Sequence, residues 1–360
     1  MRVGLVSTAP VDAPGSMRAY ADVLMQALAR HAPDVEAQMF ELSPVAASGD
    51  LAQRMEMLSL PLKAWRQRRA APDVWHVLDG SRAYLASALN GAPVVITAHD
   101  IIPWLQRQGS FPGSPPVGHA AGWLWRRNGA AMRNAQAVVC VSERTCLDIR
   151  NQFGTMADAS VVHLPVRPSL AALAGNSEGE AREPGLVLHV GNNAFYKHRA
   201  QVLRIFAKLD PGLRRSLVML GSPPTPELLQ LADRLAIAEV LRWIDGADDS
   251  ALAGWYRRAS VLLFPSLYEG FGWPVLEAMC FGLPVVCSDA GSLPEVGGPA
   301  AACFEPHDVE GFVSEADLLL GDPAYARIRG AEGLARSRQF SMESFARGTC
   351  DAYAAAIASW

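Results

Sequence analysis

The sequence predicts an α/β protein made of two successive doubly wound halves. Short apolar runs alternate along the chain with longer amphipathic segments, which is the pattern of parallel strands joined by crossover helices. The 360 residues exceed the usual size of one domain. Half of them are hydrophobic and 19% are charged, so the chain can bury large cores and is not of the disordered class.

The first half opens with a strand, a glycine loop and a helix. The strand is Arg2–Ser7, the loop contains Gly15, and Ser16 is the expected N-cap of the helix. At such a turn a phosphate or a sugar can approach the backbone, although Gly15 can also simply relieve strain. A helix is expected at about 50–69. Further strands are expected at 35–40, 74–78, 93–97, 137–141 and 160–164.

A histidine and an aspartate, His99 and Asp100, follow the expected strand 93–97. Ligands of doubly wound folds bind at the carboxyl ends of strands, so His99 can hydrogen-bond a sugar hydroxyl while Asp100 orients its ring. The alternative is a capped strand end with a satisfied histidine. The other histidines within strand patterns are expected in the core: His76, His163 and His189.

Two basic, aromatic segments occur in the first half, at 63–69 and 123–127. Residues 1–170 hold 16 Lys and Arg against 13 Asp and Glu, a charge of +3, whereas the remainder holds 16 against 23, a charge of −7. Such segments either rest on anionic lipid or form ordinary solvated helix faces. The net charge of −4 does not favour nucleic acid as a partner.

The second half begins after residues 169–185, which are small, polar and aperiodic and are predicted to form an interdomain linker. Strands are then expected at 186–190, 217–220, 240–243, 261–264, 283–287 and 302–304. Lys197 and Arg199 fall at a strand-to-helix turn, where they can neutralise a pyrophosphate. Solvated helix cations are the alternative.

The most informative stretch is 265–288, a turn and a helix between two apolar strands. It carries two acids, Glu269 and Glu277, separated by seven residues. If Glu277 lies in the first or second turn of the helix, both carboxylates can face one crevice at the strand ends. The backbone amides of Gly270, Phe271 and Gly272 can meanwhile face an anion at the helix N-terminus.

The six cysteines show no CxxC spacing, which predicts reduced thiols and neither a zinc site nor a disulfide framework. The chain opens on a strand pattern, so no leader peptide is expected, and no window reaches the roughly 20 apolar residues of a membrane span. These features predict a cytoplasmic protein.

The strand 261–264, the two acids, Gly270-Phe271-Gly272 and the turn 292–295 together resemble the retaining nucleotide-sugar glycosyltransferases of family 4. The similarity is to the bacterial branch that builds surface polysaccharides, in which mannosyl transfer is common. It implies the GT-B fold, with an acceptor-binding Rossmann-like domain at 1–170 and a donor-binding one at 171–339. A last helix, 340–360, is then expected to pack back on the first domain.

The resemblance also implies a role for each matching residue. Glu269 is placed at the donor sugar and Glu277 on the ribose hydroxyls. The backbone of Gly270, Phe271 and Gly272 is expected to contact the donor. Lys197 and Arg199 are expected to place their positive charges on the pyrophosphate. His99 is expected near the reacting sugar, and the loop with Gly15 is expected under the phosphates. Two departures occur: Asn192 stands where the family often has Arg, and Pro14-Gly15-Ser16 replaces a Gly-Gly pair.

The implied activity is metal-independent transfer of a hexose, with retention, from a nucleotide sugar to a glycan or lipid-linked saccharide. GDP-mannose is the first choice of donor, and no cofactor is expected. Because no Asp-x-Asp pair sits at a strand end, the sequence gives no divalent-ion site. The alternatives are a nucleotide-sugar epimerase on the same fold and a catalytically silent binding subunit. The predicted location is the cytoplasm, and peripheral contact with the anionic inner face of the membrane is the alternative to ordinary solvated faces for the two basic segments.

Overall fold

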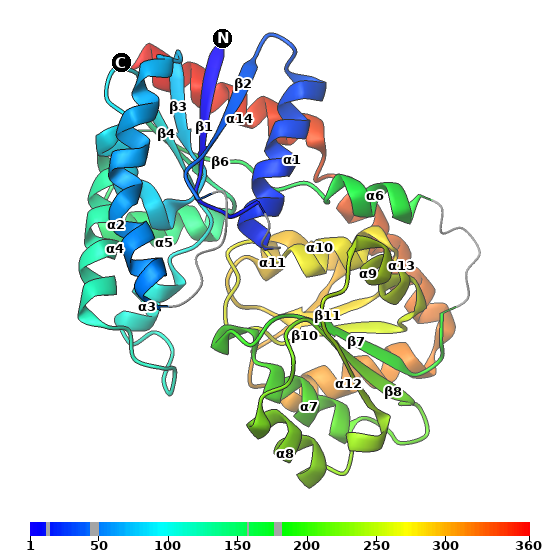
Figure 1. Cartoon of the computed structure of the whole chain (residues 1–360). Helices are drawn as coiled ribbons and strands as arrows, with labels where there is room; N and C mark the ends of the chain where they lie inside the picture. The colour runs from blue at the N-terminus through cyan, green and yellow to red at the C-terminus, as the bar shows by residue number, and fades with distance from the viewer. Residues whose placement is uncertain (12–14, 44–49, 157, 176–181) are drawn as a thin grey trace. The chain divides into compact units, whose positions relative to one another are not determined.

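The computed structural model describes residues 1–11, 15–43, 50–156, 158–175 and 182–360. The chain divides into two compact units, one formed by Met1–Pro165 with Ser341–Trp360 and the other by Val166–Phe340. Figure 1 shows a parallel sheet with helices on both faces in each unit. The boundary falls at Val166 rather than at residue 171, because the segment after Pro165 is a helix that belongs to the second unit.

The first unit is built on a six-stranded parallel sheet in the order β2-β1-β3-β4-β5-β6. Its strands are β1 (Arg2–Ser7), β2 (Glu36–Glu41), β3 (Val74–Val77), β4 (Val94–Ala98), β5 (Ala137–Cys140) and β6 (Ala159–Val161). Its helices are α1 (Ser16–His31), α2 (Asp50–Gln67), η1 (Arg68–Ala70), η2 (Gly80–Ala88), α3 (Ile102–Arg107), α4 (His119–Asn134), α5 (Glu143–Phe153) and α14 (Met342–Ala358).

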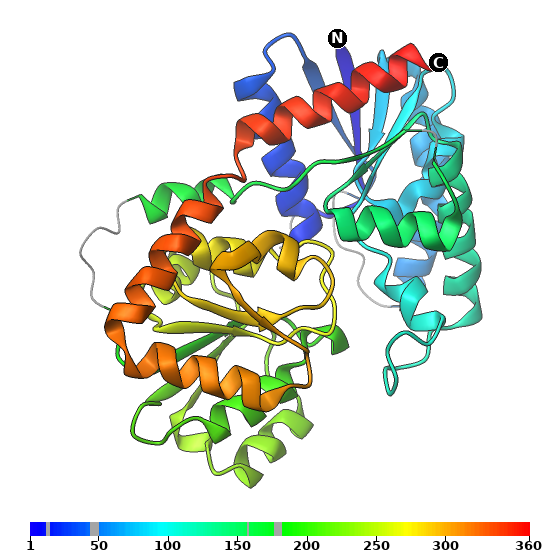
Figure 2. The same ribbon diagram turned by 180° about the vertical axis from the view of Figure 1, so that it is seen from behind.

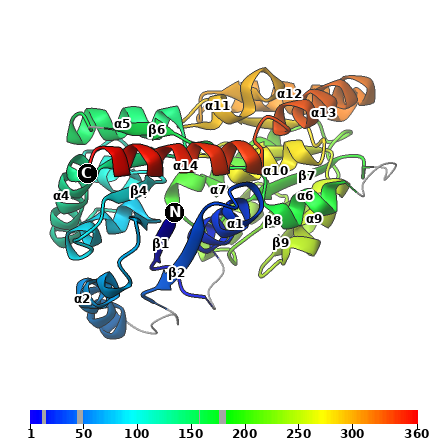
Figure 3. The ribbon, with the colours of Figure 1, turned by 90° about the horizontal axis from the view of Figure 1, so that it is seen from above.

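The last helix, α14, packs on this sheet beside α1. The rear and top views show it along the face opposite α2 (Figures 2 and 3). It is anchored through a buried hydrogen-bond chain, in which the Tyr353 hydroxyl meets Nδ1 of His76 at 2.8 Å and Nε2 of His76 meets Oγ1 of Thr97 at 2.7 Å. Burial lowers the pKa of His76 to about 3, so its imidazole stays neutral.

The second unit has a six-stranded parallel sheet in the order β12-β11-β10-β7-β8-β9. Its strands are β7 (Leu186–Val190), β8 (Ser216–Leu220), β9 (Leu241–Ile244), β10 (Val261–Phe264), β11 (Val285–Ser288) and β12 (Ala302–Phe304). Its helices are α6 (Pro168–Ala174), η3 (Phe195–Lys197), α7 (Arg199–Lys208), α8 (Pro226–Arg234), η4 (Ala238–Val240), α9 (Asp249–Arg258), α10 (Trp273–Cys280), α11 (Leu293–Gly297), η5 (Gly298–Ala300), α12 (Val309–Gly321) and α13 (Pro323–Ser337).

The strand order of the second unit reverses between β7 and β10. From β7 the chain proceeds outward to β8 and β9, and then returns to the other side of β7 to form β10. Right-handed crossovers therefore place α7 and α8 on one face and α9 and α10 on the other, as Figure 1 shows. Such a reversal separates the loops at the strand ends and opens the crevice in which doubly wound folds bind ligands.

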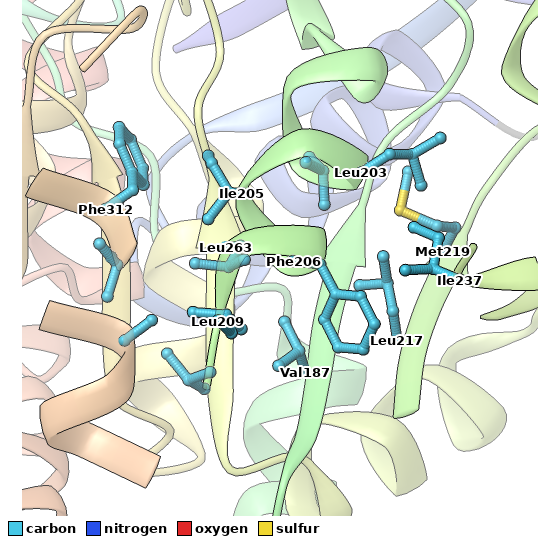
Figure 4. Packing of buried hydrophobic residues seen from close by; sticks show 14 of the residues in the cluster. Val187, Leu203, Ile205, Phe206, Leu209, Leu217, Met219, Ile237, Leu263 and Phe312 are labelled. Atoms are coloured by element: carbon cyan, nitrogen blue, oxygen red, sulfur yellow. The ribbon is translucent and has the colours of Figure 1, made fainter. Parts of the chain in front are cut away.

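An apolar core on one face of this sheet holds the strands in place. Side chains of α7, α8 and α12 pack there against side chains of β7, β8 and β10 (Figure 4). Phe206 and Phe312 are completely buried there, as is Leu263 of β10. Burying each such side chain contributes about 1.5–3 kcal/mol, so the strand ends that carry the site are rigidly held.

Four local features differ from the sequence-based predictions: three helices and the burial of one histidine. The expected linker 169–185 contains a helix, α6, because Pro168 fixes the first helical φ and Leu170 is fully buried; residues 176–181 of that linker lie outside the described residues. The short helices η2 and α3 were not expected, since neither has a long apolar period. His163 is only half-buried, whereas His76 and His189 are core residues as predicted.

Candidate active site

A lysine and a glutamate meet at the point where the strand order of the second unit reverses. Lys197 ends η3, in the loop after β7, and Glu269 lies in the loop after the neighbouring strand β10. The Lys197 Nζ atom lies 2.8 Å from Oε1 and 2.9 Å from Oε2 of Glu269. Glu269 is only 6% exposed. The lysine also lies 5.2 Å from the centre of the Phe264 ring, so both charges are held in a largely dry place.

The backbone of Glu269 is clamped by the loop that follows β11. The amide and the hydroxyl of Ser292 both donate to the Glu269 carbonyl oxygen at 3.1 Å. Gly291 sits against the same peptide with a φ of +63°, and a Cβ atom there would lie 2.3 Å from that oxygen. Only glycine allows this approach, so the expected turn at 292–295 supports the site through its backbone.

The glycine segment after Glu269 leads directly into α10. Gly272 is the residue before the helix, with a φ of +95°, and a Cβ atom there would lie 2.6 Å from the Leu293 side chain. Phe271 is buried and packs edge-on against Phe340 at 5.9 Å. Gly270, Phe271 and Gly272 therefore stand at the positive end of the helix dipole, as the sequence suggested.

The second acid, Glu277, occupies the second turn of α10 and is 2% exposed. Its Oε1 atom accepts a hydrogen bond from Nε of Arg167 at 2.7 Å, and its Oε2 atom accepts one from the Tyr256 hydroxyl at 2.9 Å. Burial, and then the Glu277 charge, raise the pKa of Tyr256, which therefore stays protonated and donates. Arg167 lies outside every motif, so no local pattern pointed to it.

Arg199, a predicted pyrophosphate ligand, is almost fully buried. Its Nη1 atom donates to the Asn193 side chain and, at 2.9 Å, to the Ser222 carbonyl oxygen, and its guanidinium lies 5.0 Å from the Trp243 ring centre. Nε and Nη2 have no partner among the described residues. Burial lowers its pKa to about 10, so Arg199 remains a cation beside the loops after β7 and β8, with two buried nitrogens that no described side chain or backbone group engages.

Asn192, which stands where an arginine was expected, has a conformational role. Its Oδ1 atom accepts a hydrogen bond from the amide of Ala194 at 3.0 Å, which closes an Asx turn ahead of η3. Only Lys197 and Arg199 therefore bring positive charge from this loop and the start of α7.

The first unit presents His99 and Gly15 at the carboxyl edge of its own sheet. Nε2 of His99 lies 2.9 Å from the Leu78 carbonyl oxygen, and the ring meets the edge of Tyr20 at 4.6 Å. The carbonyl oxygen can only accept, so Nε2 carries the proton and Nδ1 is an acceptor. Burial lowers the pKa of His99 despite the nearby Asp79, which keeps the ring neutral. Asp100 accepts from the amide of Ile102 at 2.9 Å.

Gly15 precedes α1 with extended backbone, and nothing lies within 4 Å of the position of a Cβ atom there. Its surroundings among the described residues are thus open, and any residue can adopt its φ of 173°. Pro14, in the same loop, lies outside the described residues.

Two kinds of feature are absent from the part of the chain that the structure describes. No group of three or more His, Cys, Asp or Glu side chains is placed to hold a metal ion. None of the described helices combines the length and the apolar character needed to cross a bilayer.

Two doubly wound units, each with a six-stranded parallel sheet, form the GT-B fold of glycosyltransferases. The family described as "Glycosyl transferases group 1" matches residues 175–334, and "Glycosyltransferase Family 4" matches residues 19–170. Together the two matches span most of the chain, which belongs to the family 4 glycosyltransferases. It is an enzyme that transfers a hexose.

Two curated relatives are mannosyltransferases. The O-antigen chain mannosyltransferase B of Escherichia coli is 28% identical over 315 residues, which cover 84% of this chain and 80% of the relative. The MMP alpha-(1->4)-mannosyltransferase of Mycolicibacterium hassiacum is 36% identical over 160 residues, or 43% of this chain and 36% of the relative.

Solved structures share the fold over almost the whole chain. The sucrose-phosphate synthase of Thermosynechococcus elongatus has a TM-score of 0.77 at 21% identity, with 98% of each chain covered. Anabaena HepE in complex with UDP-glucose has a TM-score of 0.74 at 16% identity, again with 98% of each chain covered. The fold of this chain is therefore the fold of known GT-B glycosyltransferases.

Proposed function

We propose that this enzyme transfers a hexose, with retention and without a metal ion, from a nucleotide sugar to a saccharide acceptor in surface-polysaccharide synthesis. The observation that carries the proposal is the buried pair Lys197–Glu269 at the strand-order reversal. Mannose from GDP-mannose is the first choice of donor, because two relatives are named as mannosyltransferases. The acceptor is a glycan or a lipid-linked saccharide.

Lys197 suits the departing nucleoside diphosphate. Its ammonium group has three N–H donors, and the two oxygens of Glu269 engage two of them. The third donor remains for a phosphate oxygen, where negative charge grows as the bond to the sugar breaks. A fixed cation in a water-poor site stabilises that charge far better than water does. Arg199 adds a second cation nearby, and because its side chain is almost fully buried it acts through its charge rather than through direct contact.

Glu269 and His99, each within its own unit, have side chains that suit a sugar hydroxyl. The Glu269 carboxylate lies beside Lys197 and can accept a hydrogen bond from a hydroxyl of the donor. The neutral ring of His99, which the resemblance assigns to the reacting sugar, offers Nδ1 as an acceptor. In the reaction, the bond from the anomeric carbon to the phosphate oxygen breaks and a bond to the acceptor oxygen forms on the same face. The acceptor's proton passes to the departing phosphate oxygen, so neither residue needs to form a covalent bond.

A covalent step through Glu269 is the rival mechanism, and trapping separates the two. Wild-type enzyme is incubated with a slow donor analogue and its intact mass is measured. We expect no glycosyl adduct. An adduct on wild-type enzyme that disappears in Glu269→Gln would replace same-face attack by double displacement.

A thermal-shift panel of GDP-, UDP-, ADP- and dTDP-sugars tests the proposed function itself. A ligand present at 100 times its dissociation constant stabilises the native state by about 2.7 kcal/mol, so the true donor raises Tm by several degrees. We expect GDP-mannose to give the largest shift, and product to form when a saccharide acceptor is added. No shift with any donor would refute a nucleotide-sugar enzyme, and binding without product would indicate a silent subunit.

We further propose that the enzyme works in the cytoplasm at the inner face of the membrane, resting on α2. Four exposed apolar side chains follow one side of this helix at spacings of three and four residues. They are Met55, Leu58, Leu62 and Trp65, with exposed fractions of 61%, 77%, 52% and 41%. Exposed arginines lie at its end, and Arg68 stacks on Trp65 at 4.4 Å. An apolar stripe beside cations suits anionic lipid.

Sedimentation with phosphatidylglycerol vesicles tests this surface. We expect the wild-type protein to bind, and Leu58→Ser with Leu62→Ser to weaken binding at least tenfold, because each leucine loses apolar burial. The matched control is Leu318→Ser with Ile328→Ser, which removes two comparably exposed side chains from the second unit. Equal binding of all three proteins would refute the proposal, as would a stripe that is instead covered by a second copy of the chain in solution.

A further inference from the structure

We propose that Arg167 and Tyr256 are positioning residues that set the Glu277 carboxylate to receive the two ribose hydroxyls of the donor. The inference rests on the proposed function, in which the donor is a nucleotide sugar and Glu277 holds its ribose. It assigns a task to Arg167, which lies at the entry to the second unit and outside every sequence motif.

Both oxygens of the Glu277 carboxylate are already hydrogen-bonded by the protein. Arg167 donates to Oε1 and Tyr256 donates to Oε2, so each oxygen of Glu277 receives one hydrogen bond. A carboxylate has about four acceptor positions, two on each oxygen. One position per oxygen therefore stays unfilled, so the carboxylate can accept one further hydrogen bond on each oxygen. A ribose offers a vicinal diol, which can donate both.

The side chains of Arg167 and Tyr256, which donate these hydrogen bonds, are themselves held in place by further contacts. Arg167 also donates through Nη1 to Oδ1 of Asp249 at 2.7 Å, so two carboxylates on different helices fix its guanidinium plane. Ser169 hydrogen-bonds the other oxygen of Asp249. Tyr256 is fully buried and stacks on Phe281 at 5.5 Å with an interplanar angle of 26°. A carboxylate approached by two fixed donors has one orientation rather than several.

The burial of the Glu277 charge also favours a functional role for Arg167. Glu277 is nearly dry, and a buried carboxylate without an opposing charge is costly to the folded state. Arg167 supplies the opposing charge. Burial by itself lowers the pKa of Arg167, but its contacts with Glu277, together with the charge of Asp249, raise that pKa overall. A buried ion pair adds little net stability over apolar residues of similar volume. A function is therefore the better reason for a charged network at this place.

The test compares the binding of a ribonucleotide and its deoxy forms. GDP or UDP, whichever the donor panel selects, is titrated calorimetrically together with its 2′-deoxy and 3′-deoxy forms. We expect wild-type enzyme to prefer the ribonucleotide, and Glu277→Gln to lose most of that preference. Arg167→Met and Tyr256→Phe should each weaken ribonucleotide binding about 10- to 100-fold, because a hydrogen bond to a charged group is worth about 1.5–3 kcal/mol, and leave the deoxy forms nearly unchanged.

Three further measurements separate positioning from a structural role. KM for the donor should rise in Arg167→Met while kcat changes little, and Arg167→Lys should recover part of the affinity. The double variant Arg167→Met/Glu277→Gln should bind no worse than Glu277→Gln alone, since coupled residues are not additive. The matched control is Arg258→Met, which breaks the Arg258–Glu183 ion pair of the same unit and should leave binding unchanged.

The possible failures are distinguishable. If wild-type enzyme binds no nucleotide, the proposed function is wrong. If Glu277→Gln abolishes the ribose preference but Arg167→Met and Tyr256→Phe retain it, the positioning role is wrong and the function stands. If Arg167→Met does not fold, the same comparison of ribonucleotide and deoxy forms is made with Tyr256→Phe and Arg167→Lys. An undiminished preference for the ribonucleotide in both variants would overturn the inference.

Discussion

Replacing Lys197 by Met is expected to lower kcat by about 10²- to 10³-fold, as for the loss of one group that stabilises developing negative charge. The lysine lies in the loop after β7 with its ammonium on Glu269, and the departing diphosphate would lose that cation. The measurement is initial rate at saturating donor and acceptor, with donor affinity determined separately. A rate within tenfold of wild type would contradict the role.

Two further variants make this result specific. Lys208→Met removes a lysine whose pair with Glu310 is solvent-exposed, and it should leave both rate and stability almost unchanged. Lys197→Met also leaves the Glu269 carboxylate buried without its cation, so it should lower Tm. The double variant Lys197→Met/Glu269→Gln should recover stability but not turnover. Recovery of both would mean that the pair is only structural.

Replacing Gly291 by Ala is expected to destabilise the protein by about 3 kcal/mol or more and to impair turnover. Its φ of +63° is unfavourable for alanine, and the new Cβ atom would lie 2.3 Å from the Glu269 carbonyl oxygen and 2.6 Å from its amide nitrogen. Because both contacts are backbone, the loop carrying Glu269 must move. Denaturant unfolding and the rate of the folded variant measure the two effects.

The control for this substitution is Gly254→Ala. Gly254 lies inside α9, and nothing lies within 4 Å of the position of a Cβ atom there. Alanine is the better helix former, so this variant should be neutral or up to about 1 kcal/mol more stable. If Gly291→Ala unfolds at the same denaturant concentration as Gly254→Ala, the close approach at Glu269 is not a constraint.

The strands and the principal site residues were accessible from the sequence because their signals are local. Apolar runs such as 261–264 and 186–190 formed β10 and β7 where they were expected. Glu269 and the glycines after it were recognisable because they lie together in one short stretch at a strand end, where doubly wound folds bind ligands, and match the motif of the family. Their catalytic and binding roles remain predictions.

Other parts of the site have no local signal. Arg167 lies 110 residues from Glu277, and Lys197 lies 72 residues from Glu269. Nothing in the spacing of such pairs indicates contact. The helix α6 was mistaken for linker because burial of Leu170 against the second unit, rather than helical period, stabilises it.

The sequence by itself determined the class of this protein, because the parallel α/β pattern and the Glu269–Glu277 motif can each be recognised within a few consecutive residues. The tertiary structure decided which charges meet. The reversal of strand order brings β7 beside β10 and so sets Lys197 on Glu269. The entry of the chain into the second unit sets Arg167 on Glu277. Such contacts depend on topology, and topology is fixed only when the whole core is packed.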